Sequence, residues 1–237
     1  MKWGQYYIDT SRARTCNLPV KNVVNYKAIK FGKKNTHQGE YAVVWDDERK
    51  IIQIHFQETN GREDWIDNLT FPKKQYDTFE WNGKKITLYV HRGWGDMYLA
   101  IKHDIHVDFE ACREAHKDEV KGYECVGWSL GSGQAMLAAQ DLNWRYGIKP
   151  DIITFGSVKP FYYTSKTTKE YLDSCYNRAM NFCHRSDVIT YQPPFVGYNM
   201  FNRVDIGPFG FFKLFDPYNY HTHYYLDELY EGIPEWS

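Results

Sequence analysis

Residues 123–133 read YECVGWSLGSG, and the chain continues as QAMLAAQDLNW to residue 144. A short apolar run, which predicts a strand over 123–127, leads into Gly-Trp-Ser-Leu-Gly, and small apolar residues then recur at helical spacing. In this order of strand, tight turn and helix, a serine oxygen can be exposed at the end of a buried strand. Ser129 is therefore a candidate nucleophile, and a serine in a purely structural turn is the alternative. A Cβ at Gly127 or Gly131 would collide with the neighbouring strand or helix, so both glycines are expected to be required.

The segments around this motif alternate between strands and helices. The sequence predicts a helix from Met97 to about Lys117 and a second helix after Ser129 that stops near Gly147 and Pro150. The predicted strands are 41–46, 51–56, 86–91, 123–127, 151–156 and 178–183, and the first two form a hairpin. This alternation predicts an α/β fold with a mostly parallel central sheet, helices on both faces and an antiparallel edge hairpin. We expect the 237 residues to form a single domain, 1–237.

Charge and cysteine content argue against several functional classes. Lys and Arg total 29 and Asp and Glu total 30, so the formal charge of -1 gives no electrostatic reason to expect nucleic acid or an anionic membrane surface as a partner. The five cysteines are odd in number and contain no C-x-x-C pair. That pattern favours reduced, buried thiols over a disulfide framework or a zinc ribbon.

The chain carries no recognisable targeting or membrane segment. Residues 1–21 lack the apolar stretch of a signal peptide, and no run approaches the roughly 18 apolar residues of a membrane span. We therefore expect no transmembrane segment and a cytoplasmic location by default. Secretion stays open, because a leader removed beforehand would leave the same sequence.

A base and an orienting carboxylate follow the serine in the order that α/β hydrolases use, which is serine, acid, histidine. Asp187 stands in FCHRSDVITYQPP, directly after a predicted strand, where a loop residue reaches the carboxyl edge of the sheet. His221 stands in YNYHTHYYLDELY near the C-terminus, and His223 is a rival for the same role.

Six blocks in order make the sequence resemble the class 3 lipases, the α/β-hydrolase family of fungal triacylglycerol lipases and their relatives. The likeness runs from about residue 40 to residue 230. The blocks are FQETNGREDWIDNLTF (56–71), VHRGWGDMY (90–98), GWSLGSGQAMLAAQDL (127–142), TFGS (154–157), DVITYQPP (187–194) and HTHYY (221–225).

By this resemblance Ser129 is the nucleophile, Asp187 the orienting acid and His221 the general base. His221 is preferred to His223 because only His221 has tyrosines at the third and fourth positions after it. The resemblance also implies an oxyanion hole formed by the backbone N–H groups of Leu130 and Thr59, with the threonine hydroxyl as a third donor.

The sequence departs from the family pattern at four positions. Trp128 replaces a histidine beside the nucleophile, and Ser132 replaces a glycine, a modest change if the helix has already begun there. Gln57 and Glu58 replace the arginine and glycine before the oxyanion threonine. A carboxylate at Glu58 would repel a developing oxyanion unless it turned to solvent, so this residue favours a non-catalytic alternative.

Other polar and aromatic residues have plainer interpretations. His103, His106, Glu110 and Glu114 form a solvated helix face more readily than a metal site, because no further ligand cluster completes a coordination sphere. His91 and His184 are expected to be structural, and His55 to face the other side of the sheet from its neighbours. For two segments the functional and the structural interpretations stay open. Trp65, Ile66 and Leu69 form a lid or a core, and GPFGFFKLF (207–215) lines an acyl pocket, meets lipid or packs as a loop.

These observations predict a serine carboxylic-ester hydrolase that acts on a lipid or other acyl ester through an acyl-enzyme. We expect no organic cofactor and no metal, and contact with a lipid interface that is transient. A phospholipase A1 or a small-ester esterase is the alternative within the enzymes. A binding or structural protein on a hydrolase scaffold is the alternative outside them.

Overall fold

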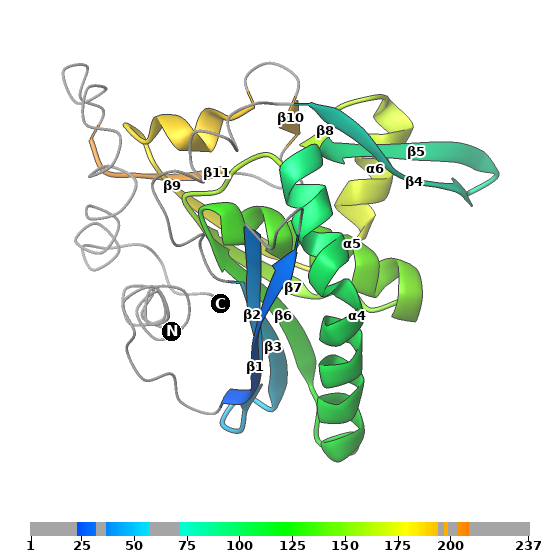
Figure 1. Ribbon diagram of the computed structural model, residues 1–237, viewed down its shortest axis with the longest axis vertical. Helices are drawn as coiled ribbons and strands as arrows, with labels where there is room; N and C mark the ends of the chain where they lie inside the picture. The colour runs from blue at the N-terminus through cyan, green and yellow to red at the C-terminus, as the bar shows by residue number, and fades with distance from the viewer. Residues whose placement is uncertain (1–22, 32–36, 57–71, 194–196, 199–202, 209–237) are drawn as a thin grey trace.

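The computed structural model describes residues 23–31, 37–56, 72–193, 197–198 and 203–208 (Figure 1). A seven-stranded sheet runs through these residues in the order β1-β2-β3-β6-β7-β9-β11. Its strands are β1 (Val23–Phe31), β2 (His37–Asp46), β3 (Ile51–Phe56), β6 (Gly122–Trp128), β7 (Asp151–Phe155), β9 (Ala179–His184) and β11 (Arg203–Ile206).

The direction of the strands follows the sequence prediction. From β3 to β11 every neighbouring pair is parallel, whereas β1 and β2 add an antiparallel edge. The predicted hairpin is confirmed, since β2 and β3 pair from Asp46 with Ile51 to Tyr41 with Phe56. Lys50 closes its turn with a φ of 56°.

Among the described residues, three α-helices lie between the parallel strands. They are α4 (Arg92–Ala115), α5 (Leu130–Tyr146) and α6 (Lys166–Ser174). Successive parallel strands step in one direction across the sheet, and right-handed crossovers then place their helices on the same face. In agreement, α4 contacts β1, β2 and β3, α5 contacts β3, β6 and β7, and the two helices contact each other (Figure 1). The two long helices of the described residues therefore share one face of the sheet, whereas the sequence predicted helices on both faces.

The core lies between the sheet and these helices. The predicted apolar face of α4 is confirmed, because Ile101, Ile105 and Phe109 are fully buried. Every residue of α5 from Leu130 to Leu142 is buried, as the small residues of this helix allow. The helix ends where the sequence predicted, at Gly147, which has a φ of 68° and donates its N–H to the Asn143 carbonyl at 2.9 Å.

A second, four-stranded sheet in the order β10-β8-β5-β4 lies outside the central one. It contains β4 (Lys73–Trp81), β5 (Lys84–His91), β8 (Phe161–Tyr162) and β10 (Gly197–Tyr198). The strand predicted over 86–91 belongs to this sheet, and its hairpin partner β4 was not predicted. The β4 sequence KKQYDTFEW is mostly polar and has no buried residue, so it lacks the apolar signal of the central strands.

Candidate active site

Ser129 sits at the turn between β6 and α5, in a backbone conformation that side chains rarely adopt. Its φ is 53° and its ψ is -122°. Such a conformation costs on the order of 1–3 kcal/mol and persists only where the surroundings impose it. The turn is tied to the next strand, because Ser129 N–H donates to the Phe155 carbonyl at 2.8 Å. The residue keeps only 3% of its surface exposed, so Ser129 is buried here, whereas the motif is one that can expose the serine oxygen.

Gly127 makes this turn sterically possible. A Cβ at Gly127 would lie 2.1 Å from the Gly131 carbonyl oxygen and 2.6 Å from the Ser132 nitrogen. Both atoms belong to the backbone of the first turn of α5, which cannot move away as a flexible side chain could. The predicted requirement for glycine at 127 therefore has a physical cause, which is the close approach of the helix.

Leu130 is the first residue of α5. Backbone N–H groups in the first turn of a helix have no intrahelical partner, and the helix dipole favours negative charge there. The Leu130 N–H is therefore suited to bind an oxyanion formed at the Ser129 side chain. The other predicted donor, Thr59, and its neighbours Gln57 and Glu58 lie outside the described residues.

Asp187 follows β9 and is fully buried. Its Oδ1 accepts the Ile189 N–H at 3.0 Å, and its own N–H donates to the His184 carbonyl at 3.0 Å, so the loop holds the carboxylate in place. Strand β7 separates β9 from β6. Because parallel strands end at one edge, Ser129 and Asp187 both lie at the carboxyl edge of the central sheet.

The predicted bases lie beyond the described chain. His221 and His223 fall in this region, as do Trp65, Ile66 and Leu69 and all of segment 207–215 except its first two residues. The structure thus brings Ser129, Leu130 and Asp187 to one sheet edge. The imidazole, the oxyanion threonine and the lid or core role of Trp65, Ile66 and Leu69 remain sequence predictions.

Three other histidines occupy structural positions, as predicted. His91 is buried and stacks on Trp94 with ring centroids 4.2 Å apart. His184 Nδ1 accepts the Ser186 N–H at 3.1 Å. His55 shares a hydrogen bond of 3.0 Å with Gln53 on its own face of the sheet, whereas Ile54 and Phe56 on the other face join the core.

The expected solvated face of α4 is only partly found. His103, Glu110 and Glu114 are exposed, but His106 is buried against α5. Its Nε2 lies 2.7 Å from Asp141 Oδ2, and its Nδ1 lies 2.8 Å from the Tyr146 hydroxyl. Within the described residues no group of three or more His, Cys, Asp or Glu side chains is placed to hold a metal ion.

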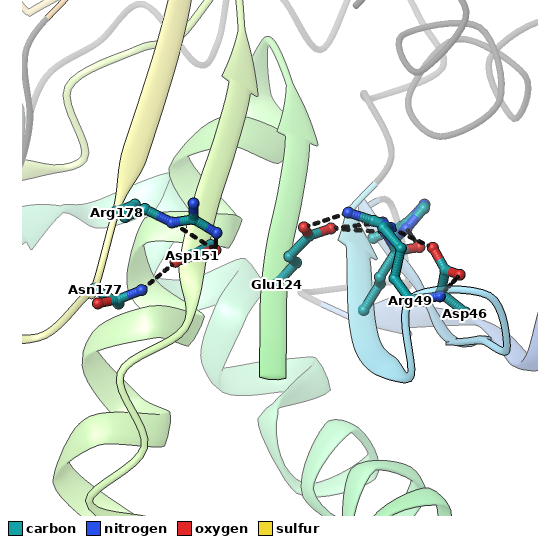
Figure 2. A network of polar contacts seen from close by, with 8 residues as sticks. Asp46, Arg49, Glu124, Asp151, Asn177 and Arg178 are labelled. Carbon is teal, nitrogen blue, oxygen red and sulfur yellow. Dashed lines mark hydrogen bonds and ion pairs between the residues drawn. The ribbon is translucent and has the colours of Figure 1, made fainter. Parts of the chain in front are cut away.

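The sequence did not point to a group of charged residues at the amino edge of the sheet (Figure 2). The side chain of Arg49, from the β2–β3 hairpin, binds Glu124 through two contacts of 2.7 and 3.1 Å and Asp46 through one of 2.6 Å. On the other side of β6, Arg178 lies 2.7 Å from Asp151. All of these residues except Asp46 line a cavity of about 630 Å³ at the edge opposite to Ser129. A glutamate inside the apolar run YECVG was the available signal, because a buried charge requires a partner.

Four of the five cysteines are described, and all four are free and buried, as predicted. Burial raises the pKa of the Cys175 and Cys183 thiols to about 12. Thiols of this kind stay protonated near neutral pH and are poor nucleophiles. Burial also raises the pKa of the Cys112 and Cys125 thiols, so none of the four described cysteines is an activated nucleophile.

Comparison with known proteins places these features in a family. The family model described as Lipase (class 3) matches residues 53–197, which is more than half of the chain. The match includes the turn at Ser129 and the loop of Asp187, and it ends before the predicted histidines. A comparison with curated protein sequences finds no match.

Solved lipase structures share the fold. The triacylglyceride lipase of Rhizomucor miehei superposes with a TM-score of 0.64 at 19% identity, covering 78% of this chain and 66% of that one. Lipase II of Rhizopus niveus gives a TM-score of 0.57 at 21% identity, covering 81% and 72%. The chain spans less than two thirds of several of these proteins, and only 58% of a fungal lipase solved with an inhibitor. At these identities the likeness shows the α/β-hydrolase fold predicted from the sequence.

Proposed function

Because the chain belongs to the class 3 lipase family, we propose that it is a serine hydrolase that cleaves a carboxylic ester of a lipid or another acyl compound. The observation that carries this proposal is the backbone of Ser129, which is held at a φ of 53° between a buried strand and the N-terminus of α5. A φ of 53° combined with a ψ of -122° is a conformation that normally requires glycine, and a serine persists there only where its surroundings impose it. One solved relative is described as a triacylglycerol lipase whose catalytic centre is a serine protease triad.

The proposed reaction has two steps. Ser129 Oγ attacks the ester carbonyl carbon while the base, His221, takes the hydroxyl proton. The carbonyl oxygen becomes an oxyanion, which the N–H groups of Leu130 and Thr59 bind. The C–O bond to the alcohol then breaks, and the alcohol leaves with the proton. Water attacks the acyl-enzyme in the same way, which releases the acid and restores the Ser129 hydroxyl.

Asp187 supports this role by its burial and its position. It comes from the same sheet edge as Ser129, and it has no exposed surface. A buried carboxylate can orient an imidazole and stabilise its protonated form. We assign it to that task, with His221 as its partner and His223 as the rival.

A fluorophosphonate probe tests the proposal directly, because it phosphonylates only an activated serine. Mass spectrometry of the folded protein is expected to find the label on Ser129, and Ser129→Ala to abolish it. Ser129→Ala retains the glycines of the turn, so a circular dichroism spectrum equal to that of the natural chain controls for folding. Absence of label on folded natural chain would reject catalysis and support the scaffold alternative suggested by Glu58.

The choice of base is tested by a matched pair of variants. We expect His221→Ala to lower the labelling rate by about 10³-fold or more, because removal of a triad member typically has an effect of at least this size. His223→Ala is expected to change the labelling rate little. The opposite order would assign the base to His223. The two residues stand two positions apart, so a general disturbance of this segment would affect both variants alike.

The substrate class is a further part of the proposal. A related fungal lipase is described by a model for interfacial activation, which makes a transient lipid interface a reasonable partner. Within the described residues no helix has the length and hydropathy to cross a membrane. A p-nitrophenyl ester series of increasing chain length, assayed below and above the concentration at which the ester aggregates, separates the candidates. A lipase is expected to gain rate at the interface, and a small-ester esterase is not.

We also propose that residues 1–237 form one domain. The central sheet already joins strands from Val23 to Ile206. A single cooperative transition in urea, followed by two spectroscopic probes, is the expected result.

A further inference from the structure

We propose that Ser132 is a positioning residue that holds the oxyanion donor of Leu130 in its active direction. The proposal rests on the proposed function and concerns a residue at which this chain departs from its family, where glycine is usual. Ser132 lies in the first turn of α5 and is fully buried.

The contacts of its hydroxyl reach two separate backbone groups. Ser132 Oγ donates a hydrogen bond to the Ser129 carbonyl oxygen and accepts the Val158 N–H at 3.2 Å. The Ser132 N–H donates to the same Ser129 carbonyl at 3.0 Å. A hydroxyl that uses its donor and an acceptor site on fixed backbone atoms has a single orientation, so it acts as a clamp.

The clamped carbonyl belongs to the peptide unit that carries the proposed oxyanion donor. The C=O of Ser129 and the N–H of Leu130 lie in one planar trans peptide and point in opposite directions. Any rotation of this plane, which the ψ of Ser129 allows, would turn both groups together. By holding the carbonyl, Ser132 therefore fixes the direction of the Leu130 N–H without touching the substrate.

The second contact anchors the turn to a neighbouring segment. Val158 follows β7 and is buried, and it packs against the same helical turn, since a Cβ on Gly133 would lie 3.2 Å from its Cγ2. The clamp thus joins the start of α5 to the segment after β7. A glycine at 132 would provide neither the donor to Ser129 nor the acceptor for Val158.

The test measures turnover of p-nitrophenyl butyrate and the rate of fluorophosphonate labelling for Ser132→Ala. Complete loss of one oxyanion donor typically lowers kcat by about 10²–10³-fold, and we expect misdirection of the donor to lower it by about 5- to 30-fold. KM is expected to stay within about twofold, because the donor acts on the transition state more than on the bound ester. The labelling rate should fall in parallel.

Ser157→Ala is the matched control. Ser157 is equally buried, and its hydroxyl donates to the Val158 carbonyl at 3.0 Å. Ser157→Ala therefore also removes a buried hydroxyl that is hydrogen-bonded to the Val158 backbone. It makes no described hydrogen bond to the turn at Ser129. We expect it to lower thermal stability about as much as Ser132→Ala while kcat stays within about twofold. Ser132→Gly, the family residue, provides a second variant if alanine disturbs folding.

The outcomes separate the two proposals. An inert natural chain would reject the proposed function. If the natural chain is active and Ser132→Ala has the same kcat well below its melting temperature, the clamp is overturned. The clamp would also be overturned if Ser157→Ala lost as much kcat as Ser132→Ala, because the effect would then come from the loosened segment at Val158.

Discussion

At its carboxyl end, strand β6 leads through the close-packed Gly127 into Ser129, whose φ is positive. At its amino end the strand is held by Arg49, which binds two carboxylates. The carboxyl edge concentrates backbone strain, close approaches and buried hydroxyl groups. The amino edge concentrates ion pairs between side chains. Strained backbone persists only where its surroundings fix it, so the carboxyl edge is built around the conformation of Ser129, whereas the amino edge is joined by ion pairs that can change without moving the backbone.

The largest effect should come from substituting alanine for the glycine at the carboxyl end of β6. In Gly127→Ala the new Cβ would meet the Gly131 carbonyl oxygen at 2.1 Å. Relieving this overlap requires moving the start of α5, so we expect a loss of about 3–5 kcal/mol or failure to fold, measured by urea unfolding.

Gly122→Ala, at the amino end of the same strand, is the control for that change. Its Cβ would meet Ile51 Cγ2 at 3.4 Å, an ordinary contact. We expect a change within about 1 kcal/mol, stabilising or neutral, because alanine also restricts the unfolded chain. Equal losses for the two variants would contradict the difference between the edges.

A smaller effect is expected for Asp141, a buried carboxylate of α5 that side chains of α4 contact between the two edges. Burial raises the pKa of Asp141, but hydrogen bonds from His106 and Lys102 lower it below its ordinary value. The Tyr98 hydroxyl also donates to Asp141 at 2.9 Å. Asp141→Asn leaves these donors without a charged acceptor, and we expect it to cost about 2–4 kcal/mol at pH 7 in urea unfolding.

The pH dependence of this variant follows from the direction of the shift. A carboxylate with a lowered folded-state pKa contributes stability above its unfolded pKa of about 3.9 and loses it as the pH falls through the lower folded value. The difference between the natural chain and Asp141→Asn should therefore be full at pH 7 and shrink below about pH 4. Asp173→Asn, in an exposed pair with Lys169, should cost under about 1 kcal/mol at either pH.

Whether the sequence predicts a structural feature depends on how far apart in the chain the residues that determine it lie. The turn at Ser129 and the parallel strands were predictable, because a run such as YECVG and the glycines after it act locally. Strand β4 and helix α6 were not, because their sequences carry little apolar signal. The Ser132–Val158 contact joins residues 26 positions apart and the Arg49–Glu124 pair residues 75 apart. Pairs of this kind depend on how the sheet is assembled, which local pattern does not reveal.

Glu124→Gln tests the contribution of the ion pairs at the amino edge. Arg49 loses a bidentate partner, yet it keeps Asp46, and its side chain is 30% exposed, so solvent screens the charge that remains. We expect a loss of about 1–2 kcal/mol in urea unfolding, with the rate of fluorophosphonate labelling at Ser129 unchanged. A labelling rate that fell along with stability would show that the two edges are coupled through β6.

The smallest effect is expected for Asp151→Asn on the other side of β6. Arg178 is half exposed, and its contact of 2.7 Å with Asp151 is therefore screened by water and salt. Asn177 donates to Asp151 Oδ1 at 2.9 Å, and the asparagine oxygen can still accept this bond. The loss should be under about 1 kcal/mol at low salt and should shrink further in 1 M NaCl, whereas the loss in Glu124→Gln should change less because Glu124 is more deeply buried. Unfolding in urea at both salt concentrations measures this difference. If Asp151→Asn lost as much stability as Glu124→Gln, and the loss depended as little on salt, burial would not distinguish the two ion pairs.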